Sequence, residues 1–99
     1  MTPRDTSEEA PGEGLRRALA ARGWTQADLA GVLNLSRSYV SELVNGGRGI
    51  TPLVALRLEA AGLGSAVAWA ALQRDADLNA GRAGAATELE QIRRRAAGA

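Results

Sequence analysis

The residues of this sequence that could do chemistry are hydrogen-bonding side chains gathered between residues 25 and 51. The 99 residues include no histidine and no cysteine, which removes the commonest general base, the commonest metal ligand and any thiol nucleophile. The carboxylates are scattered, so the sequence offers no nucleophile–base pair and no metal cage. We therefore predict no catalytic residue, no metal site and no cofactor, and we expect binding chemistry instead.

Two short amphipathic runs, TQADLAGVL and SRSYVSELV, lie at the centre of this stretch. They open on Thr25 and Ser36, both good helix-capping residues, and Asp28 has the spacing of a capping box. Only two residues separate the runs, and the first is Asn34, which tolerates the left-handed backbone of a tight turn. So short a connection fits two helices crossing at a steep angle, the geometry of a DNA-binding helix-turn-helix.

The second of these helices presents polar side chains around a narrow apolar stripe. Val40, Leu43 and Val44 have helical spacing and are expected to be buried. Arg37 could form a bidentate contact with guanine or a contact with phosphate, while Tyr39 could pack on a sugar or within the protein. The predicted DNA-binding residues are Thr25, Gln26, Ser36, Arg37, Ser38, Tyr39, Ser41, Asn45, Arg48 and Thr51.

The charge distribution supports this position for the site. The net charge is only +1, and all 12 basic residues are arginine. Residues 1–13 carry one arginine against four acids, whereas residues 14–62 carry six arginines against three acids. The basic excess around the motif suits phosphate contacts.

The remaining chain is expected to position the motif. A helix from Pro11 to Gly23 would precede it, and Thr51 with Pro52 would start a fourth helix, largely buried through Leu53, Leu56 and Leu58. We expect Leu29, Ala30, Val32 and Leu33 to form the buried face of the helix from Thr25. The predicted organisation is a flexible tail at 1–10, a domain at 11–80, and a linker with a tail or short helix at 81–99.

A fifth helix is predicted after Ser65, and its apolar residues do not form one narrow stripe. It is therefore expected to contact two surfaces, the domain core and a partner. Trp69 could fill the core or lie in a dimer interface, and Trp69, Leu72 and Leu78 are the predicted interface residues. A two-fold homodimer reading half-sites about 34 Å apart would gain affinity for a palindromic operator.

Three segments of the sequence resemble one known family, the HigA-type antitoxins of the Cro/phage-repressor (XRE-type) helix-turn-helix class. They are PGEGLRRALAARGWTQADLA, SRSYVSELVNGGRGITPLVALRLEAAG and WAALQRDADL. Gly14 stands where the family usually has a large apolar residue. The resemblance implies an all-α, five-helix, lambda-repressor-like bundle, to which the short C-terminal helix would be an addition. It also implies a repressor that neutralises a cognate toxin and autoregulates its operon.

Two other functions stay open at this point. One is a stand-alone phage-type or chromosomal repressor without a toxin, and the other is a helical protein-interaction module. No apolar run reaches transmembrane length and the N-terminus is acidic, so we expect no membrane association and a cytoplasmic location.

Overall fold

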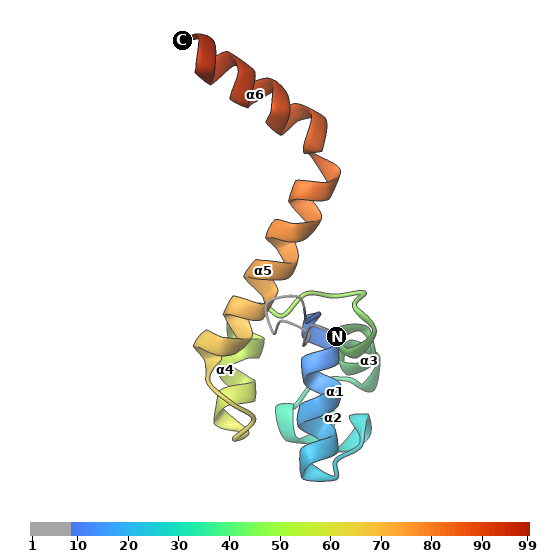
Figure 1. The fold of residues 1–99 in the computed structure, drawn as a ribbon. Helices are drawn as coiled ribbons and strands as arrows, with labels where there is room; N and C mark the ends of the chain where they lie inside the picture. The colour runs from blue at the N-terminus through green and yellow to red at the C-terminus, as the bar shows by residue number, and fades with distance from the viewer. Residues whose placement is uncertain (1–8) are drawn as a thin grey trace, which may run out of the picture.

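A computed structural model describes residues 9–99, and every regular element in that range is a helix (Figure 1). The all-α prediction is therefore confirmed. The first five helices contain every buried residue of the described chain except three, which are Glu9, Ile50 and Leu63. Beyond the end of α5, α6 lies apart from the first four helices (Figure 1). The helices are α1 (Pro11–Arg22), α2 (Gln26–Leu33), α3 (Arg37–Asn45), α4 (Pro52–Ala60), α5 (Ala66–Gly84) and α6 (Ala86–Gly98).

The predicted helix starts are confirmed by their caps. The hydroxyls of Ser36, Thr51 and Ser65 each accept a hydrogen bond from the backbone N–H three residues on. The capping box of α2 is complete, because Thr25 and Asp28 each accept a hydrogen bond from the other's backbone N–H. Such caps satisfy amide groups that the helix cannot pair itself.

The core gathers around α1, and two glycines bring that helix close to its neighbours. A Cβ on Gly12 would overlap the backbone carbonyl oxygen of Val44, so α1 rests directly on the last turn of α3. A Cβ on Gly14 would lie 3.2 Å from the ring of Trp69 and 3.3 Å from Leu72. The missing side chain at Gly14 is thus replaced by these two residues of α5.

The predicted burial of three apolar residues is wrong. Val32, Leu53 and Leu56 are 52%, 59% and 53% exposed. In α4 the buried residues are instead Val54, Ala55 and Leu58. Residues three and four apart lie on the same face of a helix, and this is the face of α4 that meets the core.

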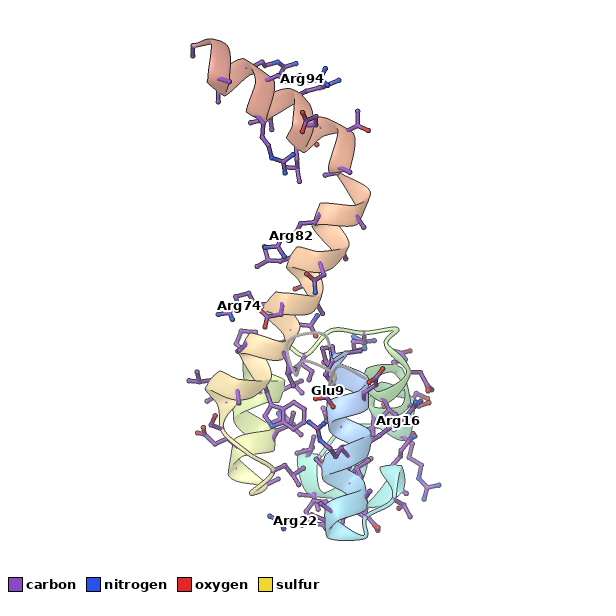
Figure 2. The ribbon with its side chains drawn as sticks, viewed as in Figure 1. Glu9, Arg16, Arg22, Arg74, Arg82 and Arg94 are labelled. Carbon is purple, nitrogen blue, oxygen red and sulfur yellow. The ribbon has the colours of Figure 1, made fainter. Side chains whose placement is uncertain are left out.

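The two ends of the chain also differ from the predicted organisation. The predicted tail at 1–10 lies outside the described residues except for Glu9 and Ala10, and Glu9 is buried beside α1, where its Oε2 is 2.6 Å from Arg17 Nη2 (Figure 2). At the other end, α5 continues past residue 80 to Gly84, and only Ala85 separates it from α6. No helix of residues 9–99 is long and apolar enough to cross a membrane.

Replacing Gly12 with alanine is expected to lower the free energy of unfolding by about 1–3 kcal/mol, because the new methyl group would push α1 away from α3. Gly31→Ala is the matched control, since a Cβ there meets nothing within 4 Å. That substitution should raise stability by up to about 1 kcal/mol through helix propensity. Denaturant unfolding followed by circular dichroism measures both values, and equal effects would contradict the close contact.

Candidate nucleic-acid interface

The turn between α2 and α3 is built as the sequence predicts. Asn34 has the left-handed backbone, with φ 56°, and is the only non-glycine residue of the described chain with positive φ. Its neighbour Leu35 is half-buried against the core. Arg57 of α4 donates a 2.6 Å hydrogen bond from Nη1 to the carbonyl oxygen of Leu33, which satisfies an end group of α2. The turn is therefore held both by its own backbone and from α4.

Helix α3 divides into a buried face and a free face. Val40, Leu43 and Val44 are at most 3% exposed and pack into the core. Arg37 and Ser38, in the first turn, are exposed and make no hydrogen bond to another described side chain. The first turn of α3 is thus available for a ligand, and its apolar stripe fixes which side faces outward.

Arg48, in the loop after α3, is held over that helix by two of its residues. Its Nε donates a 2.7 Å hydrogen bond to Glu42 Oε2, and its guanidinium carbon lies 4.3 Å from the centre of the Tyr39 ring. The hydrogen bond to Glu42 is the main cause that raises the pKa of Arg48. Arg48 is therefore an exposed, permanent cation of the kind that binds phosphate.

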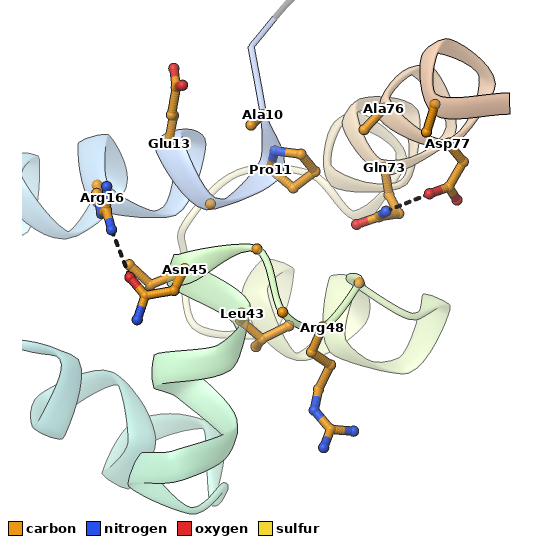
Figure 3. A pocket seen from close by; sticks show the side chains of 16 residues that line it. Ala10, Pro11, Glu13, Arg16, Leu43, Asn45, Arg48, Gln73, Ala76 and Asp77 are labelled. Atoms are coloured by element: carbon orange, nitrogen blue, oxygen red, sulfur yellow. Dashed lines mark hydrogen bonds between the residues drawn. The ribbon is translucent and has the colours of Figure 1, made fainter. Parts of the chain in front are cut away.

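Asn45 and Ser41 are linked to α1 by hydrogen bonds. Asn45 Oδ1 accepts a 2.8 Å bond from Arg16 Nη2 (Figure 3). Its Nδ2 donates a 3.2 Å bond to Ser41 Oγ. These two predicted DNA-binding side chains thus also join α1 to α3. Sequence reasoning missed Arg16, since the partner of an exposed arginine 29 positions away leaves no signal in local periodicity.

The other predicted contact residues lie at helix starts. The hydroxyl oxygens of Thr25, Ser36 and Thr51 accept capping bonds of 3.0, 3.0 and 3.2 Å, which leaves each hydroxyl proton free to donate. Gln26 is exposed in the first turn of α2. Free backbone amides and the positive end of the helix dipole at such starts attract anions.

The three predicted interface residues are not equivalent. Trp69 is only 6% exposed and its Nε1 donates a 2.9 Å hydrogen bond to the carbonyl oxygen of Leu63, so it belongs to the core and offers little surface to a partner. Leu72 is half-buried against the core, whereas Leu78 is 48% exposed.

A hollow of about 590 Å³ lies between the start of α1, the end of α3, the loop 46–49 and α5 (Figure 3). Its polar lining is largely engaged within the chain: Gln73 accepts a 2.8 Å bond from the N–H of Ile50 and donates one to Asp77. Among residues 9–99 no three histidine, cysteine or acidic side chains are grouped to hold a metal ion. The hollow therefore offers few free polar groups to a ligand, and the exposed α2–α3 surface is the better candidate for a binding site.

Comparison with known proteins agrees with this geometry. The Helix-turn-helix family matches residues 15–61, while a search of the curated proteins found no match.

Three solved structures are similar over most of the chain. The Pseudomonas aeruginosa antitoxin HigA, solved with the higBA promoter, is 32% identical, with a TM-score of 0.79 over 84% of this chain and 91% of that one. An antidote protein of a plasmid maintenance system from Nostoc punctiforme is 31% identical, with a TM-score of 0.76 over 85% and 92%. An addiction module antidote protein of the HigA family from Coxiella burnetii is 26% identical, with a TM-score of 0.76 over 84% and 91%. The chain belongs to the HigA family of DNA-binding antitoxins, within the XRE-type helix-turn-helix class.

Proposed function

We propose that the protein represses its own operon by binding a palindromic operator as a two-fold homodimer, with α3 in the major groove. The observation that carries this proposal is the division of α3, whose apolar face is buried in the core while Arg37 and Ser38 stand free in its first turn. The likeness to a HigA structure solved with promoter DNA supports it.

Each side chain has a distinct role in this proposal. Arg37 reads a base edge, and Ser38 lets the helix approach the groove closely. Gln26 and Thr25, at the start of α2, and Thr51, at the start of α4, bind phosphates together with the helix amides. Arg48 binds the DNA backbone as a cation whose position is fixed by Tyr39 and Glu42 before binding. Ser36, Ser41 and Asn45 contribute polar groups to the same DNA-facing surface. Residues 11–80 act as the DNA-binding domain and residues 81–99 as a separate arm.

The dimer forms through the distal part of α5 and through α6. Leu78 and Ile92 are 48% and 47% exposed there, and the dimer would remove this apolar surface from water. Two subunits joined in this way would present two copies of α3 to half-sites about one helical turn, ~34 Å, apart.

We also propose that the protein neutralises a cognate toxin in the cytoplasm, by binding and without catalysis. This proposal rests on the family and on its similarity to antidote proteins and antitoxins. The competing function is a repressor of the same fold that has no toxin.

Titrating the protein against its own upstream DNA tests repression. We expect saturable binding whose affinity falls as salt rises, with a slope of about −0.9 for each phosphate neutralised. Fluorescence anisotropy at several salt concentrations measures both quantities. Binding that does not saturate, or that does not respond to salt, would show that the α2–α3 surface serves another partner.

Arg37→Ala is expected to relax preference at one base pair of each half-site, with a loss of about 1–3 kcal/mol for the cognate base. Arg48→Ala is the matched control, because losing a phosphate contact should weaken all sequences alike and reduce the salt slope by about 0.9 per half-site. Anisotropy on a set of single-base operator variants separates the two patterns. A uniform loss for Arg37→Ala would reassign that residue to phosphate.

Co-expression with the product of the adjacent reading frame tests the toxin proposal. We expect the two proteins to co-purify and the growth inhibition by the adjacent product to disappear. Because α3 is proposed to serve DNA alone, Arg37→Ala should co-purify equally well. A protein that binds its operator normally but neither retains nor neutralises that product is a stand-alone repressor.

A further inference from the structure

Helix α6 is a regular helix whose contacts with the rest of the described chain are mainly with α5, the helix that it follows. None of its 13 residues is buried, and it lies beyond α5, apart from the helices of the core (Figure 1). An isolated helix of this length is marginal in water, because helix formation has a costly nucleus. Its persistence therefore requires a surface to pack against.

The apolar residues of α6 form a narrow seam that identifies the kind of surface. Ala85, at the junction with α5, is followed by Leu89, Ile92 and Ala96 of α6 at intervals of four, three and four residues. This spacing is that of the core positions of a coiled coil. Leu89 is half-buried and Ile92 is 47% exposed, so the seam is open along its length. The seam fits another helix better than it fits a flat surface.

The charged residues of α6 are divided between its two ends. Glu90, on the outer face, is paired within the helix, with Arg93 Nη1 at 3.1 Å and Arg94 Nε at 3.3 Å. Glu88 and Arg95 form no ion pair with any residue from 9 to 99. They are one heptad apart and so lie on the same edge of the seam. One edge therefore has an acidic end and a basic end.

We infer that α6 packs antiparallel against α6 of a second copy of this chain, about a two-fold axis between Glu90 and Gln91. That register places Leu89 against the partner's Ile92 and Ala85 against the partner's Ala96. It also places Glu88 beside the partner's Arg95, and the axis produces each contact twice. This inference rests on the proposed homodimer and specifies how its arms pair.

Two observations select this occupant and this direction. The seam and its charges are complementary to themselves when reversed, which a seam for an unrelated protein need not be. A parallel pair would bring the two runs Arg93–Arg95 side by side, and like charges at such distances repel. The antiparallel pair sets each basic end against an acidic end.

Single cysteines test the register, since the natural chain contains no cysteine to interfere. Ala85→Cys and Ala96→Cys are prepared separately, mixed under conditions that allow exchange, and oxidised. We expect a covalent dimer from the mixture and none from either variant alone, because 11 residues separate identical positions by about 16 Å along the axis. Dimers from each variant alone would establish parallel pairing and overturn the inference.

Light scattering and operator binding on the full chain distinguish the other outcomes. A dimer in solution that binds operator but gives no mixed disulfide would overturn the α6 pairing and leave the proposed function intact. A chain that binds no operator would overturn the proposed function, whatever the disulfides show.

A charge reversal provides the second test. Glu88→Arg should weaken self-association roughly tenfold by creating two arginine–arginine contacts, and the double variant Glu88→Arg/Arg95→Glu should restore it. Glu90→Arg makes the same change in charge on the outer face and should leave self-association nearly unchanged. Sedimentation equilibrium measures all three, and equal effects of Glu88→Arg and Glu90→Arg would overturn the inference.

Discussion

The direct contact of α1 with the last turn of α3 is the constraint on which the rest of the structure depends. A helix cannot by itself determine which of its sides meets solvent, and α3 is only nine residues long. Gly12 lets α1 lie against the carbonyl of Val44, and Arg16 is bound to Asn45 one turn further along. With its end held in this way and its apolar stripe buried, α3 presents the polar side chains of its first turn outward.

The surface that results is chemically sparse and relies on preset geometry. The first turn of α3 offers one arginine and a short hydroxyl, and the second cation, Arg48, is fixed by an aromatic ring and a carboxylate of the same helix. Fixing a side chain before binding lowers the entropy lost on association. With so few base-reading groups in the proposed interface, DNA shape and the spacing of the subunits in the proposed dimer would carry a large share of specificity.

Local signals in the sequence predicted the helix starts and the turn, because capping and left-handed backbone depend on a few adjacent residues. Thr25, Asn34, Ser36 and Thr51 belong to this class. The face that a short apolar helix buries depends instead on the helices packed against it. For this reason the sequence predicts burial for Leu53 and Leu56, which are exposed, and does not identify Val54 as a core residue. The partnership of Arg16 with Asn45, and the burial of Glu9 beside Arg17, likewise arise only from tertiary packing.

The C-terminal helix has a consequence for how such proteins diverge. Because α6 touches none of the core, changes in its seam alter neither the stability of the helix-turn-helix nor the shape of its surface. Homologous proteins in one cell can therefore acquire different seams and stop forming mixed dimers, while each continues to bind its own operator. Under the proposed α6 pairing, the single residue between α5 and α6 separates two traits that selection can adjust independently, the DNA sequence that is bound and the choice of dimer partner.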